Sequence, residues 1–514
     1  MDIILRRHDE WREHNLRWRW MLDSLEGGER YRQAIYGYDH RGLPVRNLIR
    51  HKREYPDPRE AGASFNGALV TVPNGADPAA SASDDDYELR RARTPVPTFV
   101  AESVETHLSR IYSREVKRVG PPGLMAWWAD VDGCGTTIDQ WMSETVAPLL
   151  LVLGQLDLHM DHPVAPEGEP IETRADIQRL GLDRCAASYI LPENMLWWTL
   201  DPTGQRYEEC LVQERHETGE GCSVRYRHWT VEESTLYESD GAVAAVIPNP
   251  FGVVPIVRVF DRKKPRCRNI GQSRYESIAE RQREYYNRDS ELILSDTTQA
   301  HPLLQGPEDY VQSDGTIPIG PSWLLPKKKN TQGGSATYEG FDVVDFPKAG
   351  ADSIRKNKAD IRDDVDRDSS LVKPSGRSGA AQSGLSKVMD HADGNNRLAK
   401  IAKVLARAEI IAAELALLVL GDCPVTPADR AAAQVIYPVE FDLYTASDVA
   451  AAAGDFQSLV AKSGTLPTTE GLMLGRLMRL CLPGLSDAQY AACDAEIGGH
   501  LASRADATSQ ANPS

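Results

Sequence analysis

The residues that come closest to a metal-binding pattern are Asp157, His159, Asp161 and His162. Carboxylates and imidazoles are common ligands of transition metals, so their placement decides whether they can act together. On a β-strand the side chains of the first three share one face, whereas that of His162 points to the other. No further group of ligands lies nearby in the sequence. An ordinary strand is favoured over a metal site, and the sequence predicts no bound metal.

Two glycine-containing segments resemble ligand-binding loops, and each lacks one essential residue. Residues 130–135 (DVDGCG) have the glycine of a calcium-binding loop, but Trp141 occupies the position of the bidentate glutamate. Residues 379–384 (GAAQSG) have the two glycines of a phosphate-binding loop, but Leu385 stands in place of the lysine. The patterns of serine hydrolases, zinc proteases and dinucleotide-binding folds are also missing. The sequence therefore predicts neither an enzyme nor a cofactor.

A Gly/Ser-rich loop at 369–384 carries two cations, Lys373 and Arg377, with the hydroxyl groups of Ser375 and Ser378 beside them. Such a composition leaves the backbone flexible enough to follow a moving ligand. Lysine and arginine bind phosphate groups without distinguishing base sequences. The loop is thus a candidate contact for nucleic acid, and an ordinary solvated loop is the alternative.

Two long polar helices are predicted near this loop, at 273–298 and 351–369, separated by a Pro/Gly-punctuated segment. Helices with so few apolar positions persist by packing against neighbouring chains or through charge pairs. The second helix carries both signs of charge, at Arg355, Lys358, Asp360, Arg362, Asp363, Asp364, Asp366 and Arg367. The intervening segment carries a basic run, Lys327, Lys328 and Lys329, which is a candidate partner contact or a solvated surface.

The longest helix is predicted from about 382 to about 420, because its apolar residues repeat at spacings of three and four. They are Ile401, Val404, Ala408, Ile411, Leu415 and Leu418.

The first part of the chain mixes helices and strands. Helical character is predicted over 11–36, and an amphipathic helix is predicted over 98–111 with Thr98 as its N-cap. His107, beside the apolar stripe of that helix, is interpreted as a surface or partly packed side chain. Residues 61–86 are small and polar, which indicates a flexible insertion. Two-residue alternation predicts an antiparallel meander from 206–214, 223–231, 242–247 and 253–260.

The composition is typical of a folded protein with more than one domain. The chain has 514 residues, a net charge of −17, and 41% hydrophobic and 26% charged residues. This length exceeds the roughly 250–300 residues of a single core, and the acidic excess argues against a protein that wraps duplex DNA. Eight cysteines without a C-x-x-C pair indicate reduced thiols. No apolar run reaches the roughly 20 residues of a membrane span, and no signal peptide is expected.

The order of these elements resembles that of tailed-bacteriophage portal proteins, most closely the siphophage type. In that family a polar stem helix, a small clip, a second stem helix, a tunnel loop and a very long helix follow one another. Motifs similar to those of the family occur in the same order along residues 10–450. They lie at 16–36, 89–94, 132–137, 249–257, 271–273, 300–306 and 378–385.

The resemblance implies an α+β portal fold with a mixed α/β wing, a two-helix stem, a small α/β clip, a long wing-spanning helix and a helical crown. The implied divisions are the wing (1–272, with the insertion 61–86), the first stem helix (273–300), the clip (301–350), the second stem helix (351–368), the tunnel loop (369–381), the long helix and a wing return strand (382–445), the crown (446–501) and a disordered tail (502–514).

The resemblance also implies a structural protein that forms a ring, with twelve subunits in the virion, at one vertex of the capsid. Double-stranded DNA would pass through the ring without sequence specificity. The implied partners are the large subunit of terminase, a head-completion adaptor, and the scaffolding and major capsid proteins. The implied location is the virion, and the host cytoplasm during assembly.

The resemblance assigns roles to the charged residues named above. The tunnel-loop residues would contact DNA, those of 351–368 would line the channel or pair between subunits, and the three lysines would contact a partner. Two other classes stay open: a phage-encoded metal-dependent hydrolase that uses residues 157–162, and a small-oligomer DNA-binding adaptor with a basic face.

Overall fold

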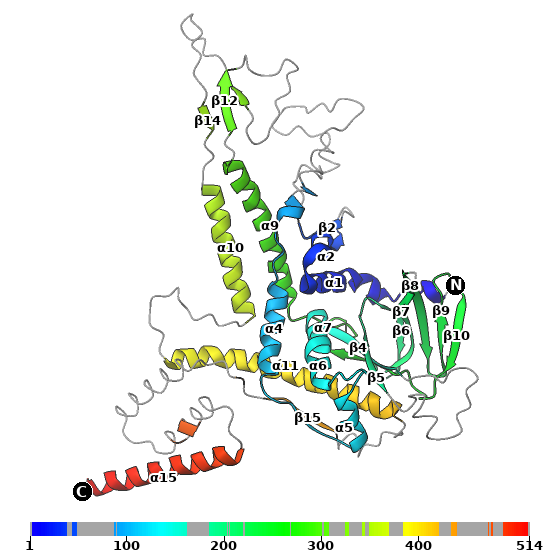
Figure 1. The fold of residues 1–514 in the computed structure, drawn as a ribbon, viewed down its shortest axis with the longest axis vertical. Helices are drawn as coiled ribbons and strands as arrows, with labels where there is room; N and C mark the ends of the chain where they lie inside the picture. The colour runs from blue at the N-terminus through cyan, green and yellow to red at the C-terminus, as the bar shows by residue number, and fades with distance from the viewer. Residues whose placement is uncertain are drawn as a thin grey trace, which may run out of the picture.

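The fold combines a wide α/β body with a long helical hairpin that projects from it (Figure 1). The computed structural model describes residues 3–38, 44–48, 87–88, 90–161, 185–202, 206–218, 221–267, 269–300, 303–307, 324–327, 342–344, 349–369, 384–420, 433–438 and 487–511, together with a few isolated positions. Helices and strands are mixed along the chain, so the predicted α+β class is confirmed. None of the helices in these ranges is long and apolar enough to cross a bilayer.

A three-stranded antiparallel sheet lies at the centre of the body. Its middle strand, β4 (Gln155–Asp161), pairs with β11 (Ile256–Phe260) on one side and with β5 (Ala186–Ile190) on the other. Every residue of β4 except the last is buried, because α7 and α11 pack on it. The helices around the sheet are α1 (Asp9–Glu26), α4 (Phe99–Ile111), α7 (Ala147–Leu153) and α11 (Gly384–Val419).

The connection from α7 into β4 requires a glycine. A continuous helical stretch, made of α6 (Ile138–Gln140), a π-helical turn (Trp141–Val146) and α7, ends at Gly154 with a φ of 78°. A β-carbon at this position would also collide with the backbone of Gln272. Glycine satisfies both the left-handed conformation and the close approach. The start of β4 is therefore packed directly against the segment that leads into α9.

A five-stranded antiparallel sheet forms the outer part of the body, in the order β10-β9-β8-β7-β6. Its strands are β6 (Met195–Leu200), β7 (Tyr207–Thr218), β8 (Gly221–Thr230), β9 (Glu233–Tyr237) and β10 (Val243–Pro248). The predicted meander is confirmed for three of its four segments. The fourth, 253–260, is wrong, because its strand β11 pairs with β4 in the other sheet. The side chain of Asn249 donates to the carbonyls of Thr230 and Val253, and this turn directs the chain out of the meander.

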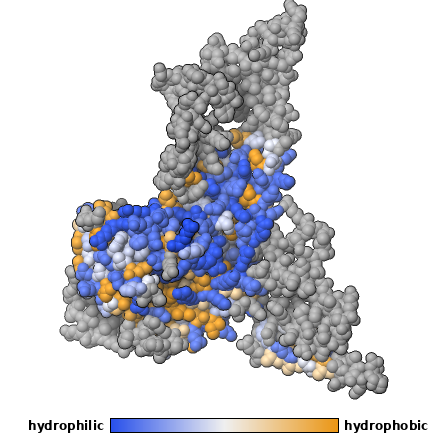
Figure 2. Space-filling view, turned by 180° about the vertical axis from the view of Figure 1, so that it is seen from behind, coloured by the Kyte–Doolittle hydropathy of each residue, from blue (hydrophilic) through white to orange (hydrophobic). Residues whose placement is uncertain are grey.

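The hairpin consists of α9 (Glu276–Ala300) and α10 (Ala349–Asp368), which lie side by side. Both helices occur where the sequence predicts polar helices. Three short strands follow at the far end, where β12 (Leu303–Pro307) pairs in parallel with β13 (Leu324–Lys327) and antiparallel with β14 (Asp342–Val344). Figure 2 shows a predominantly hydrophilic surface over the hairpin, in keeping with its sequence.

The long helix α11 runs through the lower part of the body (Figure 1). Three of its predicted stripe residues, Ile401, Ala408 and Leu415, are buried. Its burial extends beyond the predicted stripe, since Leu405 and Ala412 are also fully buried. The helix is therefore a central part of the core.

The remaining elements differ in places from their predicted bounds. The predicted helical region 11–36 is divided at Gly27, where φ is 69°, into α1 and α2 (Gly28–Gln33). Helix α15 (Asp487–Ala511) extends into the predicted disordered tail, 502–514. The insertion 61–86 and the first part of the predicted crown lie outside the described residues, except for isolated positions. The other elements are α5 (Pro122–Ala129), β1 (Ile35–Tyr38), β2 (Pro44–Arg46), β3 (Lys117–Val119) and β15 (Gln434–Ile436), the last two forming an antiparallel pair.

Candidate functional site

Charged side chains join the two helices of the hairpin along its length. The ion pairs between them are Arg281–Asp364 (2.5 Å), Arg281–Asp368 (3.3 Å), Asp289–Lys358 and Asp296–Arg355 (2.9 Å). Partly exposed pairs of this kind contribute at most about 1 kcal/mol each. Their spacing along both helices nevertheless fixes the register of α9 against α10.

The predicted stem residues are thus engaged within the chain. Arg362 extends the network to the body, because it lies 3.0 Å from Glu102 of α4 and 3.4 Å from Asp366 of its own helix. Channel lining and pairing between subunits stay predictions for these residues, since a single chain tests neither. Ion pairs within the chain involve Arg355, Lys358, Arg362, Asp364, Asp366 and Arg367. The positions of Asp360 and Asp363 on α10 are exposed.

The buried side of α9 combines apolar residues, such as Ile278 and Tyr286, with polar ones. The fully buried amide of Gln282 accepts a hydrogen bond from the backbone N–H of Val100 (2.9 Å) and donates one to the carbonyl of Ser24 (3.0 Å). Those two backbone groups lie at the start of α4 and near the end of α1, where helices leave hydrogen-bonding groups unpaired. Periodicity did not identify Gln282, because its role depends on two helices distant in sequence.

At the base of the hairpin, His107 connects three helices. Its Nδ1 lies 2.6 Å from the hydroxyl of Tyr275, and its Nε2 lies 2.6 Å from the carbonyl oxygen of Ser369. Both partners are 1% exposed. Burial lowers the pKa of His107, so the imidazole is neutral at pH 7. The side chain is partly packed, as the sequence predicts, and it has a specific hydrogen-bonding role.

A buried ionic network attaches α11 to the body. The guanidinium of Arg118 contacts Glu409 of α11 at 2.5 Å and Asp139 at 2.7 Å, and the hydroxyl of Tyr437 donates to Glu409 at 3.1 Å. Burial raises the pKa of Glu409, and the hydrogen bonds from Arg118 oppose that rise. We assign the carboxylate form at pH 7, because the positive charge is in direct contact with it.

The cluster of candidate metal ligands on β4 has structural partners. Asp157 is fully buried and contacts Arg258 at 3.0 Å, while the hydroxyl of Tyr207 donates to it at 2.5 Å. His159 lies 3.0 Å from the hydroxyl of Ser188. No group of three potential metal ligands occurs in the part of the chain that the structure describes, and His162 lies outside that part.

The calcium-like segment 130–135 forms a turn closed by Asp132. Its carboxylate accepts hydrogen bonds from the hydroxyl of Thr136 (2.5 Å) and from the backbone N–H of Cys134 (2.8 Å), which lower its pKa. The acceptor oxygens are used within the turn itself. This arrangement agrees with the interpretation of the segment as a glycine-rich turn.

The predicted DNA-contacting residues Lys373, Ser375, Arg377 and Ser378 lie outside the described residues. The same is true of Lys328 and Lys329, and Lys327 is described only as the last residue of β13. Their functions therefore stay predictions. The structure does describe both flanks of the loop, namely the end of α10 and the start of α11.

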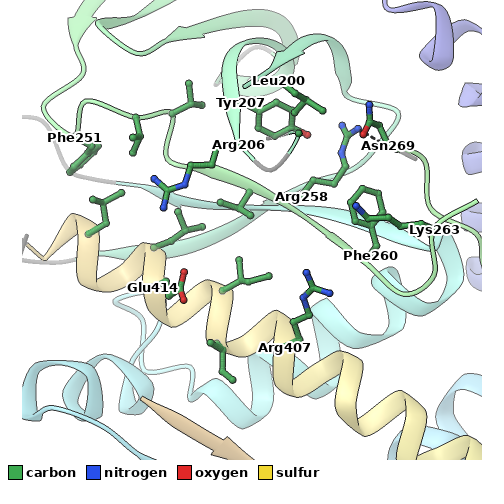
Figure 3. Close-up of a pocket in the computed structure, with 18 of the residues that line it drawn as sticks. Leu200, Arg206, Tyr207, Phe251, Arg258, Phe260, Lys263, Asn269, Arg407 and Glu414 are labelled. Atoms are coloured by element: carbon green, nitrogen blue, oxygen red, sulfur yellow. Dashed lines mark hydrogen bonds between the residues drawn. The ribbon is translucent and has the colours of Figure 1, made fainter. Parts of the chain in front are cut away.

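An open groove of about 860 Å³ lies between α11 and β11 (Figure 3). Arg206 and Arg407 approach it from opposite walls, the latter from α11. The lining combines an apolar surface with cations. The sequence did not predict this groove, because it arises where distant segments pack together. Its charged lining residues are Arg206, Arg258, Lys263, Lys403, Arg407 and Glu414.

No family model matches the sequence, and no curated protein matches it. Among solved structures, the chain is similar to one from the neck of a native GTA particle computed with C12 symmetry. The two share 13% sequence identity and superpose with a TM-score of 0.35, over 76% of this chain and 93% of the other. A superposition at this TM-score carries no argument about fold or function. The functional conclusion depends on the elements of this chain itself.

Proposed function

We propose that this chain is the subunit of a bacteriophage portal: a ring-shaped channel at one vertex of the capsid through which double-stranded DNA is packaged and ejected. Its role is structural, and the energy for DNA movement comes from a separate terminase motor. The proposed partners are the large terminase subunit, a head-completion adaptor, and scaffolding and major capsid proteins. The protein would reside in the virion, and in the host cytoplasm during assembly.

One observation carries the proposal. Two long polar helices, α9 and α10, project together from an α/β body, end in a small three-stranded sheet, and are followed by the 36-residue helix α11 in the lower part of the body (Figure 1). This arrangement supports the predicted sequence of stem, clip, stem and long helix. A hairpin that is hydrophilic over most of its surface suits an element with water on one side and neighbouring subunits on the others.

The charge of the chain fits a channel better than a DNA-binding protein. Each subunit carries a net charge of −17, and a wall of that sign repels phosphates, so DNA would slide without adhering. Lys373 and Arg377 would supply sparse, sequence-independent contacts. Neutralising both residues is expected to impair packaging or retention of DNA while ring assembly is unchanged. Packaging and retention of full-length DNA at the wild-type level would show that this assignment is wrong.

Native mass measurement and negative-stain microscopy of the purified full-length chain test the proposal directly. A portal subunit is expected to form rings of roughly a dozen copies. Head-to-tail interfaces between identical subunits close into such rings. A monomer or dimer at all concentrations, with salt-sensitive affinity for DNA, would instead identify the DNA-binding adaptor. A monomer without affinity for DNA would contradict both proposals.

A further inference from the structure

The carboxyl end of α10 is held by side chains from three other helices. Arg281 of α9 lies 3.3 Å from the carboxylate of Asp368. Arg397 of α11 donates a hydrogen bond to the backbone carbonyl of Asp368 at 2.8 Å. His107 of α4 lies 2.6 Å from the carbonyl oxygen of Ser369. The end of this helix is therefore tied to α4, α9 and α11 at the same time.

These contacts satisfy carbonyl groups that a helix end leaves without partners. Within the helix, the hydroxyl of Ser369 donates to the carbonyls of Val365 (2.8 Å) and Asp366 (3.1 Å). The carbonyls of Asp368 and Ser369 are bound by side chains from other elements, Arg397 and His107. Helix ends usually use a glycine or water for this purpose. Here the donors come from α4 and α11, so the end of α10 cannot shift without breaking both contacts.

The neutral imidazole of His107 has one tautomer that fits both of its contacts. A carbonyl oxygen only accepts, so the Nε2 facing Ser369 carries the hydrogen. The Nδ1 of a neutral ring is then an acceptor, and the hydroxyl of Tyr275 donates to it at 2.6 Å. Tyr275 directly precedes α9 and is 1% exposed. One neutral side chain thereby fixes the start of α9 and the end of α10 to α4.

We propose that His107 and Arg397 are positioning residues that fix the carboxyl end of α10, and with it the point from which segment 370–383 leaves the hairpin. The inference rests on the proposed function, because Lys373 and Arg377 of that segment are the proposed contacts with DNA. The two side chains would hold the point where this segment begins fixed against α4 and α11. Neither His107 nor Arg397 would itself touch DNA.

Hydrogen exchange on the full-length protein tests whether these side chains fix the carboxyl end of α10. The variants are His107→Ala, Arg397→Met and Tyr275→Phe. Loss of one such hydrogen bond is expected to speed exchange of the amides of residues 366–369 by about two- to tenfold. Exchange in the middle of α9 should stay unchanged. His107→Gln retains a donor for Ser369 and should restore part of the protection. Lys400→Met, at an exposed position of α11, is the matched control for Arg397→Met.

The outcomes separate this inference from the proposed function. The contacts of His107 and Arg397 with the end of α10 form the joint. Unchanged exchange at 366–369 in all three variants would contradict its role. Equal acceleration throughout the hairpin would also contradict it, because it would show a general loss of packing. Ring assembly by native mass should be unaffected, and retention of packaged DNA should fall as in a variant lacking Lys373 and Arg377. If that variant loses DNA but the joint variants do not, the positioning role is wrong and the portal stands. If the wild-type chain forms no ring, the portal is wrong, and the exchange data still decide whether the joint exists.

Discussion

Replacing Asp157 with asparagine is expected to destabilise the body of the protein strongly. The Asp157 carboxylate is fully buried and accepts hydrogen bonds from Nε of Arg258 (3.0 Å), from Nη2 of the same residue (3.1 Å) and from the hydroxyl of Tyr207 (2.5 Å). The guanidinium is only 6% exposed and lies 4.4 Å from the ring centre of Trp198. Asparagine keeps the shape but leaves this cation without its counter-charge. Removing one partner of a buried pair costs about 3–5 kcal/mol.

Asp161→Asn is the matched control, because it makes the same change on the same strand. The Asp161 side chain is 62% exposed and lies 3.5 Å from His159. A pair whose carboxylate is exposed to water contributes at most about 1 kcal/mol. Urea unfolding followed by tryptophan fluorescence should therefore separate the two variants clearly. A double variant, Asp157→Leu with Arg258→Met, should recover much of the loss, because an apolar pair can replace a buried ion pair.

The same experiment tests the metal-dependent hydrolase. If residues 157–162 bound a metal, both Asp157→Asn and Asp161→Asn would lower the metal content of the purified protein, with comparable losses of stability. A cost below about 1 kcal/mol for Asp157→Asn would also contradict the reasoning, because an unpaired buried charge must cost more than an ordinary hydrogen bond.

Three further perturbations follow from the packing. Gln282→Leu should cost about 2–3 kcal/mol in urea unfolding, because two buried backbone groups lose their partner; a cost near zero would mean that water replaces the amide. Gly154→Ala should cost at least about 2 kcal/mol, since the left-handed φ and the backbone contact both oppose a β-carbon, and wild-type stability would contradict the observed close approach. Burial lowers the pKa of His107, so the folded state binds this proton only at a lower pH than the unfolded state, which binds it below about pH 6.5. The stability that the neutral His107 contributes is therefore fully present above that pH. Below that pH, the free energy of unfolding should fall by up to about 1.4 kcal/mol per pH unit. His107→Gln should reduce this slope in urea titrations at several pH values. The cationic side chains Arg274, Arg397 and Arg110 act on the pKa in the same direction.

Periodic patterns in the sequence predicted the elements that depend on local spacing. Helix α4 occurs at the predicted place, with the apolar residues Val100, Val104 and Leu108 buried. The same is true of α10 and of three strands of the meander. Helices α4 and α10 each bury one face, and a buried face leaves a regular trace in the order of apolar residues. Strand β10 has the predicted alternation although none of its residues is buried.

Contacts between distant segments leave no such trace. Strand β11 alternates like its neighbours, yet it pairs with β4 about a hundred positions earlier. The alternation specifies a strand but not its partner, so the sequence placed it in the wrong sheet. Likewise, the sequence identified the charges of α10 but not their partners, because the register of α9 against α10 was unknown. The joint at His107 combines both difficulties, since one of its partners is a backbone carbonyl of α10.

The basic side chains of α10 form ion pairs within the chain, and this affects which cations could contact DNA. If the basic side chains of α10 met carboxylates of a neighbouring subunit, the isolated hairpin would be unbalanced and only the ring would neutralise it. Most of them instead meet acids of the same chain, so these cations have counter-charges before any assembly. The excess of −17 then remains with every subunit. In the proposed portal, a surface of that sign would repel phosphates, and close contact with DNA would fall to cations outside the hairpin network. Lys373 and Arg377, on a Gly/Ser-rich segment directly after α10, are therefore a sharper test of the portal than the charges of α10 itself.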